Sequence, residues 1–428
     1  MGLIILISFF ILLIMGIPIG FALGLSSALF LLFNPLALNT ILAQRMFYAL
    51  DSFTLMAVPL FIAAAKVMVK TQLMDNLFTF ANSLVGWIPG GVGHSNVLAS
   101  VFFAGITGAA TSDASGLGSI EIPLMKKAGY DLPFAGAVTA ASSIIGPIIP
   151  PSIPIVIYSL VSGGTSIGAL FLAGIIPGLM LAFVMMFLVF LYAKKKKEKL
   201  SLNKFSLSEL WRSTKEALPA LAMPIIILGG IYGGIFTATE AAGVALAYAL
   251  VLGVFIYKNV KIKDLCDILY ETFLTTAVIF LIMATSNMFA WILATEGIPN
   301  IFQELLLSFV SNKIVFLVIL NLILLLIGCV LETISAITIF VPIILPVALS
   351  MGIDPIHLGL IIVFSLCVGL ITPPVGMCLF VTCSITEGLV LEKLTSAIFP
   401  FIIASIFVLI IITYFPMSFM WLPRLAGF

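Results

Sequence analysis

Long apolar stretches separated by short polar connections run along almost the whole chain. A helix needs about 20 mostly apolar residues to cross the hydrocarbon core of a bilayer. Stretches of this kind include residues 4–33, 169–192, 240–257, 313–328 and 396–415. The 428 residues provide for on the order of a dozen spans, at about 30 residues per span and connection. The pattern therefore predicts an all-α polytopic membrane protein.

The sequence also contains an internal repeat at a spacing of 223 residues. Chance would give roughly one glycine pair and half a proline pair at such a shift, but five glycine pairs and four proline pairs coincide. Clear examples are Gly105 with Gly328, Gly146 with Gly369, and Pro150-Pro151 with Pro373-Pro374. We therefore predict two copies of one unit, over residues 1–200 and 219–428, joined by a linker over residues 201–218.

The linker region is the most polar part of the chain. A lysine-rich run at residues 194–199 follows a predicted span. Apolar and small residues then recur at helical spacing, at Leu207, Leu210, Trp211, Thr214 and Leu218. We interpret this pattern as an amphipathic helix on the membrane surface, although the lysine run could be no more than a solvated topogenic loop. Both interpretations place the run on the cytoplasmic side.

Positive charges predict opposite orientations for the two copies. Lys126-Lys127 in the first copy has no basic counterpart in residues 349–353, whereas the uncharged loop 162–168 corresponds to a loop that carries Lys393. Because cytoplasmic loops carry an excess of Lys and Arg, equivalent loops should lie on opposite sides of the membrane. This predicts an inverted-topology repeat, which is typical of secondary transporters.

In each copy, glycine, proline and polar residues interrupt two apolar stretches. The first breaks cover residues 105–113 and 328–333, and the second cover residues 146–152 and 369–376. We predict re-entrant helical hairpins at the first breaks and unwound helices at the second, because glycine permits tight turns and proline removes a backbone donor. Each hairpin tip should meet the unwound segment of its own copy near the bilayer midplane. The alternative is that these residues only kink continuous helices.

Paired breaks of this kind supply carbonyl oxygens and helix C-terminal ends, which suit a small hard cation such as Na+. We expect one Na+ site in each copy, and two or more coupling ions in total. The expected ligands in the first copy are the backbone carbonyls of Thr107, Gly108, Ala110, Gly146, Ile149 and Pro150. Those in the second copy are the carbonyls of Gly328, Gly369, Thr372 and Val375, together with the Thr372 hydroxyl.

Polar side chains beside the same breaks are candidates for the substrate vicinity. Half-helix N-termini suit an anion, and isolated charges in apolar runs are usually functional or paired. The candidates are Ser112, Asp113, Ser152, Glu332 and Thr333. Glu240, which follows Thr237 and Thr239, is expected to cap a helix.

Composition and charge exclude several classes of function. Hydrophobic residues make up 62% of the chain and charged residues 9%, against about 25% charged residues in soluble domains. The net charge of +1 offers no field for nucleic acid. The chain has no HExxH, GxSxG or P-loop sequence, so we expect neither an enzyme nor an organic cofactor. A membrane enzyme would have to depend on His94 and His357, which have no motif around them.

Several stretches carry a family resemblance: residues 105–123 (GITGAATSDASGLGSIEIP), 146–158 (GPIIPPSIPIVIY), 236–242 (FTATEAA), 369–380 (GLITPPVGMCLF) and 414–425 (YFPMSFMWLPRL). Over nearly its whole length the chain resembles the large membrane subunit (DctM-like, M subunit) of tripartite ATP-independent periplasmic (TRAP) transporters. It departs from the family pattern at the first hairpin tip, where members often have serines and this chain has Thr107, Ala109 and Ala110. Any ion contact of Ala109 or Ala110 must therefore be through the backbone.

The resemblance implies import of an organic acid, such as a C4-dicarboxylate, sialic acid or another sugar acid, driven by a Na+ gradient across the bacterial inner membrane. A periplasmic substrate-binding protein would deliver the substrate, and a small four-helix membrane subunit, here a separate polypeptide, would brace the large one within the lipid bilayer. The implied fold is an elevator, in which a transport domain of hairpins and broken helices moves against a scaffold that includes residues 207–217. The alternative is a stand-alone Na+-coupled anion carrier that needs no binding protein.

Overall fold

The chain is helical throughout the residues that the structure describes. A computed structural model describes residues 2–33, 39–71, 73–196, 205–298 and 312–428, and these contain helices and connections but no strand. Counted over these residues, eight helical stretches are long and apolar enough to cross a membrane. The prediction of an all-α polytopic protein is confirmed.

The helices fall into two series that follow the two sequence copies. The first series is α1 (Gly2–Ile14), α2 (Ile19–Phe33), α3 (Asn39–Leu50), the 3-10 helix η1 (Phe53–Met56), α4 (Ala57–Lys70), α5 (Leu73–Val85), α6 (Gly91–Thr107), α7 (Ala110–Lys127), α8 (Leu132–Ser143), α9 (Ile153–Val161) and α10 (Ile167–Lys196). The second is α11 (Leu207–Tyr232), α12 (Ala238–Leu250), the π-helix η2 (Val251–Ile256), α13 (Ile262–Thr295), α15 (Lys313–Val330), α16 (Thr333–Ser350), α17 (Pro355–Gly369), α18 (Met377–Ile385), α19 (Leu391–Tyr414) and α20 (Met417–Leu425).

The helix bounds carry the 223-residue spacing of the sequence repeat. The bounds of α7 and α16 differ by this spacing at both ends, and α6 and α15 end at equivalent residues. One difference is that α13 is a single helix of 34 residues, whereas the equivalent part of the first copy is divided into α3, η1 and α4. The division falls at Asp51 and Ser52, and the backbone of Ser52 is extended. The equivalent residues of the second copy, Leu274 and Thr275, lie inside α13. Short polar side chains favour such exits from a helix.

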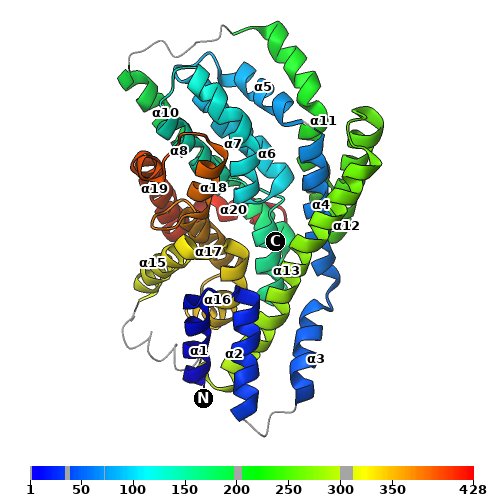
Figure 1. The fold of residues 1–428 in the computed structure, drawn as a ribbon, viewed down its shortest axis with the longest axis vertical. Coiled ribbons are helices and arrows are strands. Elements are labelled where there is room, and N and C mark those ends of the chain that lie inside the picture. The colour runs from blue at the N-terminus through cyan, green and yellow to red at the C-terminus, as the bar shows by residue number, and fades with distance from the viewer. Residues whose placement is uncertain (1, 34–38, 72, 197–204, 299–311) are drawn as a thin grey trace.

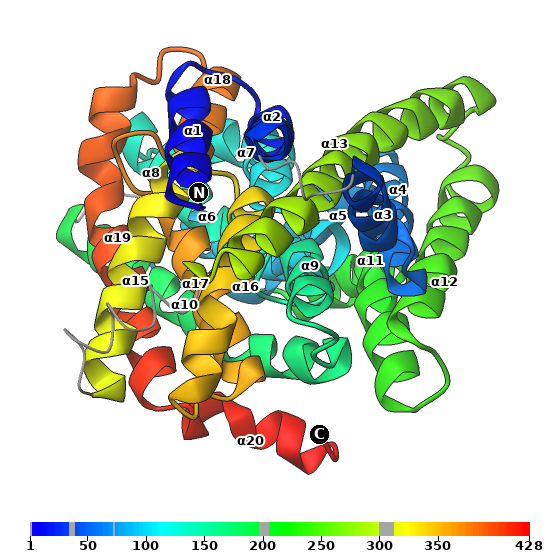
Figure 2. The same cartoon turned by 90° about the horizontal axis from the view of Figure 1, so that it is seen from below.

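Most of the helices pack into two units (Figures 1 and 2). We call α2–α4 and α11–α13 the frame, because α4 packs on α12 and α13 packs on α2, α3 and α4. We call α6–α10 and α15–α20 the hairpin unit. The two units meet where α4, α11 and α13 contact α6, α9 and α16.

Both copies contribute to the core of the hairpin unit. In Figure 1 the α6–α7 hairpin occupies the upper part of the molecule and α16 the lower part, so the two hairpins approach the centre from opposite ends. The Tyr158 ring of α9 fits against Gly359 of α17, and its hydroxyl donates to the Pro355 carbonyl (2.6 Å). The hairpin unit is therefore one interlocked body rather than two repeats placed side by side.

The linker prediction needs a correction. Residues 207–217 do not form a separate surface helix, because α11 continues through Pro219 and Pro224 to Tyr232. A transmembrane helix tolerates proline where neighbouring groups satisfy the freed carbonyls, and no glycine follows until Gly229. Lys194 and Lys195 lie in the last turn of α10, which ends at Lys196, whereas residues 197–199 of the lysine run lie outside the described residues.

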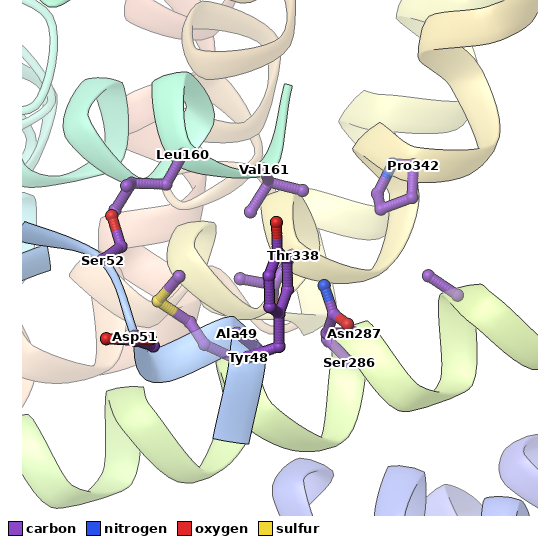
Figure 3. A pocket seen from close by; sticks show the side chains of 12 residues that line it. Tyr48, Ala49, Asp51, Ser52, Leu160, Val161, Ser286, Asn287, Thr338 and Pro342 are labelled. Atoms are coloured by element: carbon purple, nitrogen blue, oxygen red, sulfur yellow. The ribbon is translucent and has the colours of Figure 1, made fainter. Parts of the chain in front are cut away.

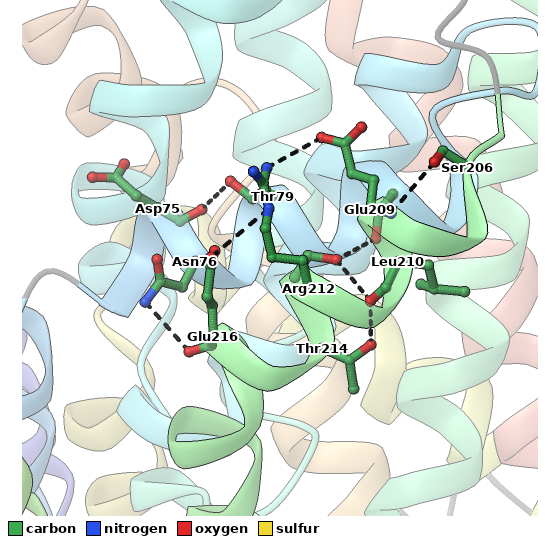
Figure 4. A network of polar contacts seen from close by, with 11 residues as sticks. Asp75, Asn76, Thr79, Ser206, Glu209, Leu210, Arg212, Thr214 and Glu216 are labelled. Carbon is green, nitrogen blue, oxygen red and sulfur yellow. Dashed lines mark hydrogen bonds and ion pairs between the residues drawn. The ribbon is translucent and has the colours of Figure 1, made fainter.

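The first half of α11 is nevertheless amphipathic. Arg212 lies between Glu209 and Glu216 on its polar side (Figure 4), at 3.6 and 3.9 Å from their carboxylates. The adjoining side of α11 contacts α5, where the Ser83 and Ser213 hydroxyls lie 2.8 Å apart. The apolar residues Leu207, Trp211 and Leu218 remain exposed, as a surface facing lipid or a membrane partner requires.

Candidate functional site

The first hairpin turns at Gly108 and Ala109, between α6 and α7. Gly108 has a φ of 61°, and a Cβ there would collide with the Pro151 carbonyl oxygen. Only glycine allows both this left-handed conformation and this close approach. The tip of the first hairpin therefore lies against the unwound segment between α8 and α9.

Asp113 joins the two breaks of the first copy. It lies in the first turn of α7 and is 1% exposed. Its Oδ1 accepts a hydrogen bond from the Thr107 hydroxyl, whereas Oδ2 has no hydrogen-bond partner among the described residues. A Cβ at Gly146 would collide with Oδ2. Thr107, Asp113 and Gly146 thus form one cluster where α6 and α8 end, which we call the first tip cluster.

The second hairpin meets its unwound segment through direct backbone contact. A Cβ at Gly328 would lie 2.6 Å from the Leu366 carbonyl oxygen and 3.1 Å from the Gly369 Cα. The Gly376 amide donates to the Cys329 carbonyl (3.1 Å). We call this meeting point of α15 and α17 the second tip cluster.

Thr372 and Glu332 are the polar side chains of the second tip cluster. The half-buried Thr372 hydroxyl donates to the Val368 carbonyl (2.7 Å), so its oxygen keeps lone pairs for a further ligand. Glu332 caps α16 by accepting from the amides of Ile334 (3.0 Å) and Ser335 (3.3 Å). Its carboxylate satisfies a helix end within the chain.

Both tip clusters have the chemistry of a small hard cation site. The C-terminal ends of α6 and α8 meet at one cluster, and those of α15 and α17 meet at the other. Such ends carry partial negative charge and carbonyls without helical partners. The first cluster adds a carboxylate with an unpartnered oxygen, whose burial is costly unless a cation or a donor pairs with it. The second cluster adds a hydroxyl.

The remaining predicted site residues either make local contacts at the breaks or lie outside the tip clusters. Ser152 caps α9 (3.3 Å to the Ile155 amide) and donates to the Pro147 carbonyl. Ser112 is exposed on α7, so it lies outside the first tip cluster. Ala110 and Thr333 are buried at the starts of α7 and α16, and Val375 is half-buried. Ile149 packs against Gly178. Pro150 and Pro151 are joined by a cis peptide bond, as are Pro373 and Pro374.

A cavity with a partly polar lining lies between the frame and the hairpin unit, and none of the five substrate candidates lines it. Its volume is about 410 Å³. Figure 3 shows frame side chains from the α3–η1 connection and from α13 meeting side chains of α9 and α16. The lining includes Tyr48, Asp51, Ser52, Ser286, Asn287, Leu160, Val161 and Thr338. Sequence reasoning missed these residues; the available signal was the polar pair Asp51-Ser52 inside an apolar region.

Two buried asparagines tie the hairpins to the unwound helices. In the first copy, Asn96 of α6 donates to Thr139 (2.8 Å) and accepts from Ser142 of α8 (3.0 Å). In the second, Asn321 of α15 donates to Thr413 (2.9 Å) and accepts from Ser365 of α17 (3.2 Å). Ser142 and Ser365 are equivalent in the repeat. We call these contacts the asparagine clamps; sequence reasoning did not identify them.

Comparisons with known proteins agree over almost the whole chain. Residues 6–418 match the family model described as tripartite ATP-independent periplasmic transporter, DctM component. The chain is 41% identical over 414 residues to the large permease protein SiaM of the sialic acid TRAP transporter of Vibrio cholerae serotype O1, which is 97% of this chain and 96% of that protein. It is 37% identical to the large permease protein DctM of the C4-dicarboxylate TRAP transporter of Pseudomonas aeruginosa, over 95% and 94% of the two chains.

A solved structure with a similar fold is the YdaH transporter of Alcanivorax borkumensis. The TM-score is 0.57, and the match covers 86% of each chain at 14% sequence identity. At this identity the likeness concerns the fold alone.

Proposed function

The chain belongs to the DctM component family of tripartite ATP-independent periplasmic transporters, and we propose that it imports a hydroxylated organic acid together with Na+. It is a large permease subunit and a multi-pass protein of the bacterial inner membrane. The observation that carries the proposal is the cavity between frame and hairpin unit, with two cation-type tip clusters inside the hairpin unit.

The cavity lining favours a sugar acid, such as sialic acid, over a simple dicarboxylate. Ser286, Asn287 and Thr338 offer hydrogen-bond donors to a carboxylate. Asp51 is an acceptor on the opposite part of the lining, and substrate hydroxyls can donate to it. A second substrate carboxylate near Asp51 would meet like-charge repulsion. The relatives named for sialic acid and for C4-dicarboxylate are each more than a third identical to the chain, so substrate class has to be argued from the lining.

We propose that each tip cluster holds one Na+, and that the two ions organise the hairpins. Filling a cluster would neutralise the helix ends and the Asp113 oxygen that has no partner, and this would stabilise the packing of each tip on its unwound segment. The hairpin unit supplies Leu160, Val161, Thr338 and Pro342 to the cavity, whereas the frame supplies the rest. An elevator movement of the hairpin unit against the frame would therefore open the cavity to each side in turn.

The partners in this proposal are a small membrane subunit and a periplasmic binding protein. Large apolar side chains on the outer side of the frame, such as Leu269, Phe273 and Val278 of α13, are exposed; lipid or a membrane partner would cover them. The proposal gives the chain no catalytic role and no organic cofactor.

Reconstituted vesicles test the proposal directly. The chain and its small membrane partner are inserted into vesicles, and uptake of labelled sialic acid is measured with the binding protein and an inward Na+ gradient. We expect uptake that needs both the binding protein and Na+, and that rises more steeply than first order with Na+ concentration. An inside-negative potential should accelerate uptake, because it contributes ~2.3 kcal/mol of driving force per 100 mV for one net charge moved. Uptake without the binding protein would favour a stand-alone carrier, and uptake without Na+ would contradict the coupling.

The lining provides a sharper test of the substrate class. Asp51→Asn should reduce uptake of the hydroxylated acid, because the best acceptor for its hydroxyls is lost. Asp75→Asn, on α5 outside the cavity lining, serves as the matched control and should behave like the parent protein. An unchanged uptake in Asp51→Asn would remove the reason for preferring a sugar acid.

A further inference from the structure

Glu121 is a buried acid that belongs neither to the proposed Na+ sites nor to the cavity lining. It lies on α7, eight positions after Asp113, and is 0% exposed. Neither of its carboxylate oxygens has a hydrogen-bond partner among the described residues. Sequence reasoning did not single it out, although its place between Ile120 and Ile122 makes it an isolated charge in an apolar run.

Glu121 stands where the two sequence copies pack together. α7 packs against α6, α8 and α18. A Cβ at Gly118, one turn before Glu121, would lie 2.8 Å from the Ile385 Cδ1 of α18 and 3.0 Å from the Thr139 Cγ2 of α8. A charge that develops at Glu121 would therefore develop inside the contact between copies.

The surrounding helices offer no cation to balance a carboxylate. Among their described residues, α8 carries no ionisable side chain, α18 carries only the thiols of Cys378 and Cys383, and α6 carries His94, whose ring nitrogen bonds the Pro89 carbonyl. On α7 itself the other acid is Asp113, and Lys126 and Lys127 are exposed at its far end. An ionised Glu121 would be a buried charge without partner, which proteins avoid by keeping the group neutral.

A metal ion does not suit this position. A hard cation requires several oxygen ligands around it, but the described residues contain no group of three or more Asp, Glu, His or Cys side chains that could hold a metal ion. In addition, α7 is helical from Ala110 to Lys127, so most of its carbonyls are engaged in the helix. A proton neutralises the carboxylate without further ligands.

We propose that Glu121 is a proton-binding site of the hairpin unit, and that it must be protonated for α7, α8 and α18 to stay packed. When the proton leaves, the charge disrupts the contact between the copies. Uptake should therefore fall as pH rises; this last consequence rests on the proposed transport function.

Infrared spectroscopy of the purified complex with its membrane partner tests the site without substrate. We expect a protonated-carboxyl C=O band near neutral pH that shifts in D2O, is lost in Glu121→Gln, and persists in Asp113→Asn and in Glu387→Gln, a variant of an exposed acid. A parent protein without such a band overturns the proposal, even if Glu121→Gln fails to fold. Loss of the band in Asp113→Asn with its retention in Glu121→Gln overturns it as well.

The pH dependence of stability and of uptake gives the second measurement. Because the folded protein holds a proton that the unfolded chain releases, the unfolding temperature of the parent should fall with rising pH. It should fall less in Glu121→Gln, and uptake by this variant should stay severalfold higher at alkaline pH relative to neutral pH than uptake by the parent. Glu387→Gln should follow the parent. The proposal is contradicted if the pH profiles of stability and of uptake are the same in the parent and in Glu121→Gln. If uptake is absent but the protonated-carboxyl band is present, only the transport function is contradicted.

Discussion

At the first hairpin tip, the Asp113 carboxylate has an oxygen without a hydrogen-bond partner that points at the unwound segment. At the second tip, the Glu332 carboxylate accepts hydrogen bonds from the amides that begin α16. The repeat makes the difference systematic. Asp113 corresponds to Ala336, and Ile149 corresponds to Thr372. The first copy therefore combines an acid with an apolar residue, and the second combines a small apolar residue with a hydroxyl.

The two copies therefore share the arrangement of helix ends at the tip but differ in the polar side chain that could bind a cation there. In both copies two helices end at the tip cluster, so helix ends provide a common partial charge. The first copy adds a full charge with an unpartnered oxygen, whereas in the second copy the Glu332 carboxylate caps α16 and the added ligand is the neutral Thr372 hydroxyl. We expect the first site to depend on electrostatics and the second on the geometry of its backbone.

The largest effect should come from Asp113→Asn. The variant keeps the shape of the side chain but removes the only full charge of the first tip cluster, and breaking a buried ionic contact costs about 3–5 kcal/mol. We expect the Na+ concentration for half-maximal uptake to rise roughly 100-fold or more. Glu332→Gln is the matched variant in the second copy and should mainly weaken the α16 cap, by about 1 kcal/mol. An equal loss of Na+ affinity in both variants would end the distinction between the two tips.

Alanine at the two unwound glycines should separate backbone from side-chain packing. In Gly369→Ala the new methyl group would meet the backbone of Gly328 at 2.5 Å, which cannot move aside, so we expect a loss of about 3 kcal/mol in stability. In Gly146→Ala it would meet the Asp113 side chain, which can rotate away, so Na+ affinity should fall more than stability. Thermal unfolding and Na+-dependent uptake measure the two effects. Gly243→Ala, with open space around the position, is the control and should lower neither, because alanine inside α12 is about 0.5–1 kcal/mol more favourable than glycine.

The asparagine clamps should contribute equally to the two copies. Asn96→Ala leaves the buried Thr139 hydroxyl without a partner, and Asn321→Ala does the same to the Ser365 hydroxyl, each at a cost of about 2 kcal/mol in unfolding free energy. Denaturant unfolding of the complex measures this cost. A much smaller effect in one copy would mean that only the other hairpin is fixed to its unwound helix.

The smallest effect should come from Thr372→Val, which removes one neutral oxygen and keeps the shape. We expect a loss of about 1 kcal/mol, or roughly fivefold in Na+ affinity, with unchanged recognition by the binding protein. Initial uptake against Na+ concentration measures the change. A curve identical to that of the parent would support the view that the breaks only kink the helices.

The architecture could be predicted from the sequence because its determinants are local and repeated. Glycine and proline fix the breaks wherever they stand, and Gly108 with φ 61° turns where the first hairpin was expected to turn. The meeting of each tip with its own unwound segment followed from the pairing of breaks in the two copies. The end of α11 did not follow, because the prolines at 219 and 224 are accommodated inside the helix.

The sequence by itself determined the helical membrane fold, the duplication and the positions of the four breaks, because apolar length and backbone preference act over a few residues. Only the tertiary structure decided that Asp113 belongs with Gly146, that Glu332 caps α16, and that Asp51 and Asn287 share a cavity. It also decided that Glu121 and the asparagine clamps are buried. The physical reason is that the partners and solvent access of a side chain depend on segments distant in the chain: Asp51 and Asn287, for example, are brought together by the packing of α3 on α13.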